Sequence, residues 1–496
     1  MANYVVQDTQ LTSVANAIRA KGGTSAQLEW PQGYIDAVDA ITTGGGSASV
    51  AAAKDVNFRD YDGTVVYSYT ADEFAALTAM PDNPDHSGDE IPLTAQGWNW
   101  SLTDAQAYVA KHGRLEIGQM YIATGGKTHI LIHLEQGRTS PKLGCCPNGT
   151  VDVDWGDGTE HNTLTGTSIT TVKWTPTHKY AAPGNYDIRL TVTGSMGFYG
   201  TSSSNQYSGL LRYTSGSDNR NYIYQNAIQR VNIGRGVISI GSYAFYYCNN
   251  LASISIPDSV TSIERNAFYN CYTLSSINIP NRVTNIYDYA FNNCYSLSSI
   301  SIPDGLIGIS GNAFQACYSL TSINIPDSVN NIGGNVFGRC SSLSSINISD
   351  GVTSIPSGIF SECYNLSSIS IPASVTNIGN SAFYKCYSLA SISIPDGVTS
   401  IGSYAFQACF SLSSISIPDG VTSVVDSTFN NCYGISEYHF ASTTPPTLSN
   451  TNAFTGIAAD CIIYVPYSED HSILEAYKTA TNWSTYASKM QEEPQA

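Results

Sequence analysis

One pattern of 23 residues recurs through the second half of the chain and limits the folds available to it. Cysteine marks this period without exception, and a phenylalanine lies three residues before each cysteine. The nine cysteines are Cys248, Cys271, Cys294, Cys317, Cys340, Cys363, Cys386, Cys409 and Cys432. A period of about 20 to 29 residues with apolar residues at fixed offsets is typical of a solenoid, whose coils bury their apolar faces only against one another.

Each coil follows the pattern F-x-x-C-x-x-L-x-x-I-x-I-P, followed by a valine and a further isoleucine. The I-x-I step alternates with a period of two, as a strand requires, and the proline ends the strand because it has no amide donor. The residues A-F-x-x-C favour a single helical turn on the opposite side of the coil. We therefore predict one strand of a parallel sheet and one helical turn per coil.

The pattern decays at both ends of the array, as the end coils of a solenoid require. A degenerate coil begins at Ile228, and "IIYVP" at 462–466 stands where the last S-I-S-I-P would be. We expect a connector and N-terminal cap at 195–227, repeats at 228–466 and a C-terminal helical cap at 467–496.

The motif L-x-x-I-x-I-P-x-x-V-x-x-I-G-x-x-A-F-x-x-C resembles the BspA-like leucine-rich repeats of bacterial surface adhesins and of some phage and prophage proteins. The resemblance covers residues 228–466. It implies a leucine-rich-repeat solenoid that binds a partner and does not catalyse a reaction, and it identifies no ligand.

The cysteines form one row along the array, because coils in such a sheet stack about 4.8 Å apart. Each cysteine lies between the inward phenylalanine and leucine of the pattern, and a buried free cysteine behaves as a small hydrophobe. We predict a structural role in the core, with disulfides and metal binding as the alternatives. Zinc is disfavoured because no C-x-x-C pair occurs.

An aromatic residue follows most of these cysteines and supplies the candidate ligand-binding residues. This aromatic row consists of Tyr272, Tyr295, Tyr318, Tyr364, Tyr387, Phe410 and Tyr433 and is interrupted at Ser341. Outward aromatic rings suit the recognition of proteins or carbohydrates, since they offer a large contact area at a small entropy cost. The alternative is that the rings stack on one another and only cover the turn side of the coils.

An acidic row follows the strands. It consists of Asp258, Asp304, Asp327, Asp350, Asp396 and Asp419. Hydrated turn residues explain it, and a calcium-binding stripe is the alternative. We predict no cofactor and no metal site.

Residues 128–194 contain a second recognisable unit. "VDVDWGDGTE" and "THKYAAPGNYDIRLTVTG" predict strands joined by turns. The motifs W-G-D-G-T and H-x-Y-x-x-P-G-x-Y resemble the polycystic kidney disease (PKD) domain, which implies an immunoglobulin-like β-sandwich that acts as a spacer or interaction module.

Polar residues of this unit give no clear metal site. The carboxylates Asp152, Asp154 and Asp157 could collect a cation, although a polar strand edge explains them equally well. The histidines lack H-E-x-x-H spacing. The adjacent Cys145 and Cys146 are interpreted as a loop feature.

The N-terminal part divides into three segments. Residues 1–43 predict short helices with apolar faces, which need a partner or an oligomer to be buried. The sequences V-x-x-A-I-R-x-K-G-G-T-S and P-x-G-Y-I-D-A-V resemble the attachment modules of phage and prophage tail proteins. Residues 44–54 read as a Gly/Ser/Ala linker, and 55–127 as a small α+β domain whose helix starts at Ser101.

Composition restricts the partners. With 39 acidic and 22 basic residues the formal charge is -17, which disfavours nucleic acid and anionic membranes. No signal peptide and no apolar run of about 20 residues is evident, so no membrane insertion is expected.

The sequence therefore predicts a multidomain, mainly β protein without catalytic residues. The leading hypothesis is a phage or prophage receptor-binding protein of the virion tail. It would bind a host protein or glycan through the repeats and tail or baseplate proteins through residues 1–43, as a homo-oligomer. The alternative is a bacterial cell-surface adhesin. A glycan hydrolase ranks third, because a uniform solenoid singles out no carboxylate pair.

Overall fold

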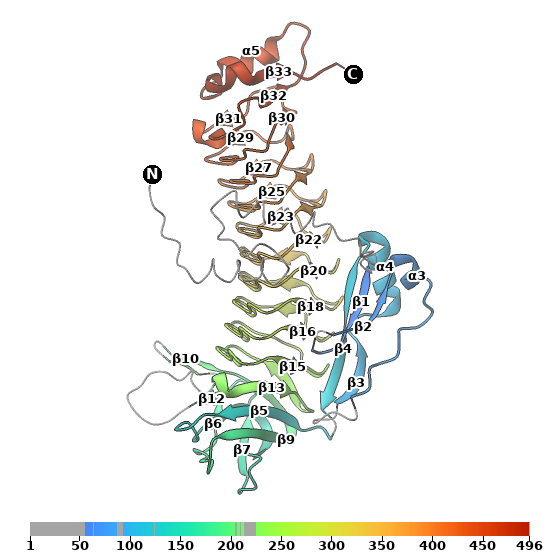
Figure 1. The fold of residues 1–496 in the computed structure, drawn as a ribbon, viewed down its shortest axis with the longest axis vertical. Helices are drawn as coiled ribbons and strands as arrows, with labels where there is room; N and C mark the ends of the chain where they lie inside the picture. The colour runs from blue at the N-terminus through green and yellow to red at the C-terminus, as the bar shows by residue number, and fades with distance from the viewer. Residues whose placement is uncertain are drawn as a thin grey trace, which may run out of the picture. The chain divides into compact units, whose positions relative to one another are not determined.

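The computed structural model describes residues 55–62, 64–86, 93–123, 125–203, 206–208, 210–212 and 225–495 (Figure 1). The chain divides into two compact units, Met1–Ala53 and Lys54–Ala496. The helices expected in 1–43 and the linker at 44–54 lie outside the described residues, and the second unit is presented by itself.

The repeats form the predicted stack of parallel strands, with two strands in most coils instead of one. Both sets pair in parallel at a shift of 23 residues, as in Ser276↔Ser299 and Asn285↔Gly308. The strands of the I-x-I set are β15 (Ser253–Ser255), β16 (Ser276–Asn278), β18 (Ser299–Ser301), β20 (Ser322–Asn324), β22 (Ser345–Asn347), β24 (Ser368–Ile369), β26 (Ser391–Ile392), β28 (Ser414–Ile417) and β30 (Glu437–Phe440).

The second set lies at the valine-isoleucine step. Its strands are β14 (Val237–Ile240), β17 (Asn285–Ile286), β19 (Gly308–Ile309), β21 (Asn331–Ile332), β23 (Ser354–Ile355), β25 (Asn377–Ile378), β27 (Ser400–Ile401), β29 (Ser423–Val424) and β31 (Thr447–Leu448). Sequence reasoning missed this set because its apolar residues, such as Val283 and Ile286, lie three positions apart and do not alternate with a period of two.

The turn side of the coil is not helical, so the prediction of a helical turn is wrong. Amides there alternate between two kinds of acceptor: Cys271 N donates to Phe268 O of its own coil, whereas Phe268 N donates to Ala290 O of the next coil at 2.8 Å. A helix would use every amide within the coil. The residue before each of the nine repeat cysteines has a positive φ, as Asn270 does at 63°. In this conformation its amide donates to a carbonyl of the next coil, as Asn270 N does to Asn292 O.

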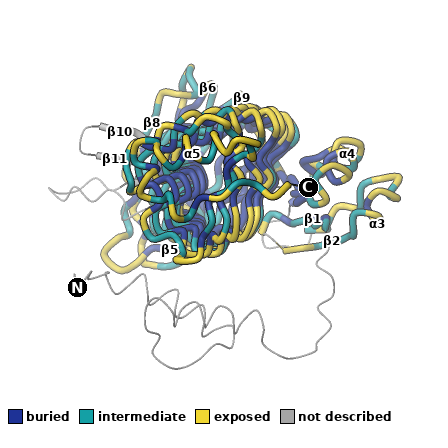
Figure 2. Tube along the Cα trace, turned by 90° about the horizontal axis from the view of Figure 1, so that it is seen from above, coloured by how far each residue is buried: buried dark blue, intermediate teal, exposed yellow. Residues whose placement is uncertain are grey.

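The interior of the array consists of aligned rows of identical side chains. Neighbouring phenylalanine rings stack from Phe245 onward, for example Phe268 on Phe291 with centroids 5.2 Å apart. The cysteines are buried, which confirms their predicted place in the core, and Cys271 Sγ donates to Phe245 O at 3.2 Å. Viewed along the stack, buried residues occupy the inside of the coils and exposed residues their rim (Figure 2).

Strands from the region before the repeats continue both sets at the first coil. This region contains β5 (Thr128–Leu134), β6 (Lys142–Asp154), β7 (Asn162–Thr167), β8 (Lys173–Trp174), β9 (Gly184–Phe198), β10 (Thr201–Ser203), β11 (Gln206–Ser208), β12 (Leu211–Arg212) and the 3₁₀ turn η2 (Gln225–Ala227). The opening strand β13 (Ile228–Asn232) pairs antiparallel with β5, and β14 pairs in parallel with the end of β9. One apolar core therefore runs from these strands into the coils.

Cys145 and Cys146 lie in β6 and are fully buried, so their interpretation as a loop feature is wrong. Cys145 joins the apolar core that this region shares with the coils. The sequence predicted a loop because Cys145 and Cys146 lie between Gly144 and Pro147, and glycine and proline are typical of turns.

The last coils end in a different set of elements. The turn η3 (Thr451–Phe454), strand β32 (Ile462–Val465), helix α5 (Ser472–Thr479), 3₁₀ helix η4 (Trp483–Lys489) and strand β33 (Met490–Glu492) follow in order. β33 pairs with β32, and buried Trp483 donates from Nε1 to Pro446 O at 2.6 Å. These elements cover apolar groups that the final coil would otherwise expose.

Residues 55–123 contain a four-stranded sheet in the order β2-β1-β4-β3 with two helices. The elements are β1 (Val56–Arg59), β2 (Val65–Tyr69), α3 (Ala71–Ala75), β3 (Leu93–Trp98), α4 (Leu102–His112) and β4 (Leu115–Ala123). Ser101 accepts from Asp104 N and begins α4, which confirms the predicted helix start, and left-handed Gly113 ends it.

Burial in the core disfavours the thiolate form of the repeat cysteines. It raises the pKa of Cys340 and Cys432 to about 12, and reaction with alkylating agents requires the thiolate. We expect no alkylation of the nine repeat cysteines in the folded chain at pH 8 and complete alkylation in guanidinium, measured by mass spectrometry.

The variant Ser341→Cys is the control, because it places one thiol outside the core beside buried Cys340. This single thiol should react in the folded chain. Alkylation of the repeat cysteines without denaturant would show that the row is accessible.

Candidate binding surfaces of the repeat array

The aromatic row forms two continuous ring stacks. Tyr272, Tyr295 and Tyr318 make the first, with centroids 4.6 and 4.9 Å apart. The second runs from Tyr364 through Tyr387 and Phe410 to Tyr433 at spacings of 4.9, 4.7 and 5.7 Å. Ser341 separates them because it supplies no ring.

The rings of this aromatic row are half-buried, and only Tyr433, at 57%, is largely exposed. Burial raises the pKa of Tyr272 and Tyr387 to about 12, so their hydroxyls stay protonated and can donate. The row can thus present ring edges and hydroxyl groups at fixed spacing, and part of each ring is used in stacking.

The strand side of the coils carries a polar row that sequence reasoning missed. It occupies the variable position of I-x-I and consists of Ser255, Asn278, Ser301, Asn324, Asn347, Ser370, Ser393 and Ser416. The first five contact residues 112–121, at the end of α4 and in β4, so this stretch crosses five coils.

Each of these five side chains donates to a backbone carbonyl of residues 112–121. Asn278 Nδ2 bonds Gln119 O at 2.9 Å, Ser301 Oγ bonds Glu116 O at 3.1 Å, and Asn324 Nδ2 bonds Arg114 O at 2.9 Å. Ser255 and Asn347 make the same contact to Tyr121 and His112 at 3.4 and 3.3 Å. The polar row therefore binds main-chain carbonyls from the last residue of α4 through the connecting residues to β4, with one carbonyl of residues 112–121 bound by each of the five coils.

Side chains of the α+β region complete this interface. Trp100 Nε1 donates to Ile302 O at 2.8 Å, and Tyr108 OH donates to Ile325 O at 3.0 Å. Both aromatic residues are buried. Each polar tip thereby satisfies a carbonyl at the end of an I-x-I strand while its ring removes apolar surface from water.

Two carboxylates of the acidic row bind cations of the same chain. Lys111 Nζ lies 2.9 Å from Asp327 and 2.8 Å from Asp350, and His112 Nε2 lies 2.8 Å from Asp327. Burial favours the neutral acid, but the hydrogen bonds from Lys111 and His112 outweigh it and lower the pKa of Asp327. Of the other four carboxylates, Asp258 and Asp304 are partly buried, whereas Asp396 and Asp419 are exposed.

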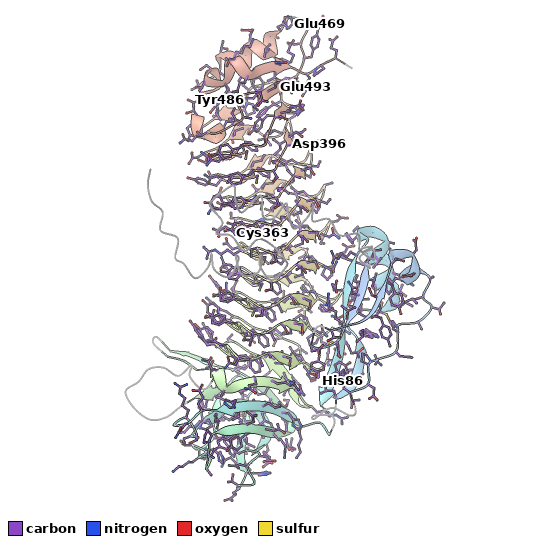
Figure 3. The ribbon with its side chains drawn as sticks, viewed as in Figure 1. His86, Cys363, Asp396, Glu469, Tyr486 and Glu493 are labelled. Carbon is purple, nitrogen blue, oxygen red and sulfur yellow. The ribbon has the colours of Figure 1, made fainter. Side chains whose placement is uncertain are left out.

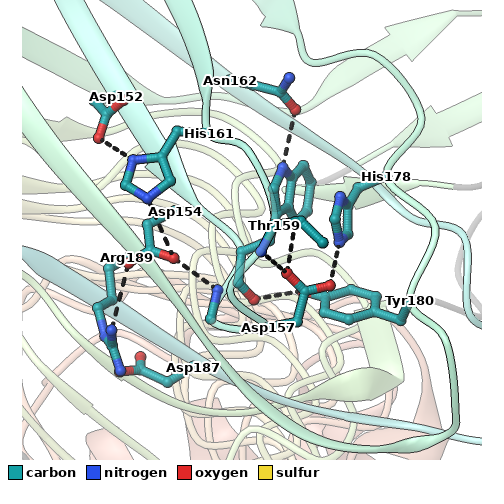
Figure 4. A network of polar contacts seen from close by, with 12 residues as sticks. Asp152, Asp154, Asp157, Thr159, His161, Asn162, His178, Tyr180, Asp187 and Arg189 are labelled. Atoms are coloured by element: carbon teal, nitrogen blue, oxygen red, sulfur yellow. Dashed lines mark hydrogen bonds and ion pairs between the residues drawn. The ribbon is translucent and has the colours of Figure 1, made fainter.

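The carboxylates of the predicted PKD-like region are also paired within the chain (Figure 4). His161 Nδ1 lies 2.9 Å from Asp152, Arg189 Nη1 lies 3.4 Å from Asp154, and His178 Nε2 lies 2.9 Å from Asp157. Among the described residues no group of three or more metal-binding side chains occurs. These contacts hold strands and turns together.

Because Gly118 has no side chain, β4 can approach the polar row closely. A Cβ at this position would lie 2.5 Å from Asn278 Cγ and 2.7 Å from Ser301 Cβ, far inside contact distance. We expect Gly118→Ala to weaken the interface by about 1 to 3 kcal/mol. Amides of 115–123 should then exchange hydrogen about fivefold faster or more, because local opening becomes easier.

Gly305→Ala is the matched control, since its added Cβ would meet only Asn281 O at an ordinary 3.4 Å. It should leave exchange in 115–123 unchanged. Equal exchange in the two variants would contradict the assigned packing of β4.

Comparisons with known proteins agree with this architecture. The family described as "BspA type Leucine rich repeat region" matches residues 219–344 and 330–457 in six copies. Comparison with curated proteins finds no match. Among the helices of the described part of the chain, none is long and apolar enough to cross a membrane.

Solved structures of bacterial leucine-rich-repeat proteins are similar to part of the chain. A leucine rich cell surface protein from Faecalibacterium prausnitzii is 30% identical, with 52% of this chain and 77% of that chain covered and a TM-score of 0.35. The leucine rich repeat protein of T. pallidum is 29% identical, with 43% and 90% covered and a TM-score of 0.31. A Bacteroides ovatus protein is 24% identical, with 59% and 97% covered and a TM-score of 0.34.

Proposed function

Because its repeat array belongs to the BspA type leucine-rich repeat family, we propose that this chain is a bacterial cell-surface adhesin that binds a protein or glycan of another cell. The structure of the F. prausnitzii relative is described as that of a cell surface protein, which supports this location. In this proposal the chain acts by binding and not by catalysis, because the uniform coils single out no pair of carboxylates that could act as acid and base.

The aromatic row is the observation that carries the proposal. Its two stacks hold seven rings at fixed spacing, each open to solvent along part of its surface. A ligand that contacts several rings pays little entropy to order them, because stacking already fixes their positions. Repeated weak contacts along the row, made by several copies of the chain on one cell, would together strengthen attachment to the other cell.

The strands before the repeats act as a rigid spacer of the PKD type. Support comes from the buried Trp155, whose ring stacks on His178 at 4.4 Å and whose carbonyl accepts from Tyr180 OH. These are residues of the two PKD-like motifs. Because β5 and β9 continue into the coils, a load on the repeats would pass directly to this spacer.

A phage or prophage tail protein with the same binding role is the second candidate. It is supported by the resemblance of residues 1–43 to tail attachment modules, whereas the family and the F. prausnitzii relative favour a bacterial surface protein. We expect antibodies to detect the chain on intact bacterial cells. Detection in purified phage particles instead, with none on cells, would favour the tail role and a homo-oligomer anchored through 1–43.

Replacing three ring positions tests the aromatic row. We expect Tyr295→Ser, Tyr318→Ser and Tyr387→Ser together to reduce adhesion of beads coated with the full chain to cultured epithelial cells by about tenfold, because interface aromatics contribute a large share of binding energy. The matched triple Phe variant keeps the stacks and separates ring contact from hydroxyl contact.

Thermal unfolding of both variants checks that the coils remain folded. Unchanged adhesion by a folded Ser variant would show that the rings serve packing alone. Equal loss in the Phe and Ser variants would assign the binding to the hydroxyl groups.

A further inference from the structure

The polar row continues beyond the segment that covers its first half. Ser255, Ser301 and Asn324 are buried beneath the α+β region, whereas Ser370, Ser393 and Ser416 are exposed. The supporting isoleucines remain in the core of both halves, so the exposed serines are held on the same kind of strand. The uncovered half is thus a continuation of a surface that already binds peptide main chain.

The covered half shows what this surface recognises. Its hydroxyl and amide groups bind backbone carbonyls, and Asn324 Oδ1 also accepts from Glu116 N at 3.1 Å. A serine hydroxyl can donate and accept in the same way. The exposed half of the polar row presents serines and no aromatic rings on which a sugar could stack, so polypeptide fits it better than glycan.

The carboxylates of the acidic row favour a ligand with positively charged side chains. In the covered half Lys111 binds Asp327 and Asp350 beside the polar row. Asp396 and Asp419 lie three residues after Ser393 and Ser416, at the corresponding place in their coils, and Asp396 projects at the coil edge (Figure 3). The net charge of -17 further favours a cationic partner.

We propose that the exposed strand side of residues 368–419 binds an extended polypeptide segment with basic side chains. Its carbonyls bond Ser370, Ser393 and Ser416, and its lysine or arginine side chains pair with Asp396 and Asp419. This site lies on the strand side and not in the aromatic row, so it does not depend on the adhesin role.

Titration of the full chain with synthetic peptides tests the site. The probe is a capped nonapeptide of alternating lysine and threonine, and the control is the same peptide with glutamate in place of lysine. We expect saturable one-site binding of the lysine peptide by calorimetry, weakened by added salt, and no binding of the glutamate peptide.

Variants locate the binding. Asp396→Asn with Asp419→Asn should weaken the lysine peptide at least tenfold. The matched control Asp460→Asn with Glu469→Gln removes the same charge from exposed positions in the C-terminal elements and should change affinity less than twofold. Ser393→Asn, which installs the amide found at Asn324, should bind as tightly as the parent or tighter.

Three outcomes would overturn the proposal: no saturable binding to the folded parent chain, equal loss in the two charge variants, or equal binding of both peptides. None of these outcomes concerns the aromatic row, so a failure here is distinguishable from a failure of the adhesin role. Thermal unfolding of each variant confirms that a loss of binding is not a loss of fold.

Discussion

Along the turn side of the array, every second backbone amide donates to a carbonyl of the next coil. The contact recurs from Phe245 N–Ala267 O to Phe429 N–Ala453 O. It fixes the spacing at which phenylalanine rings stack, cysteines fill the gap beside them and the outer aromatic rings meet. A chain that made these bonds within one coil would form a helix and lose the alignment of all three rows.

The same alignment turns single residues into surfaces. A serine at the variable position of one I-x-I strand is unremarkable, but eight coils in register place such residues along one line. Five of them bind main-chain carbonyls of residues 112–121 in the α+β region. In the same way, Lys111 pairs with two members of the acidic row. Recognition on this protein therefore arises from repetition more than from any individual side chain.

The sequence predicts the repeat, its period, the parallel strands and the buried cysteines, because each depends on apolar residues at fixed spacing. The turn conformation escaped prediction, since the left-handed position before each cysteine holds residues as different as Asn270, Arg339 and Lys385 instead of glycine. The docking of residues 112–121 joins positions that are 134 to 235 residues apart and leaves only a weak signal in the sequence. That signal is asparagine at 278, 324 and 347, where the uncovered coils have serine.

The segment that crosses the first coils also determines where the array can change in length. Five successive coils must meet five carbonyls between His112 and Tyr121, so a coil added or lost there would shift every later contact out of register. Beyond Asp350 no hydrogen bond or ion pair with residues 111–121 is seen among the described residues, and successive coils up to Cys432 repeat the same junction. We therefore expect gain or loss of whole 23-residue units to be tolerated better in the C-terminal coils, where it would lengthen or shorten the exposed surfaces without moving the contacts with residues 112–121.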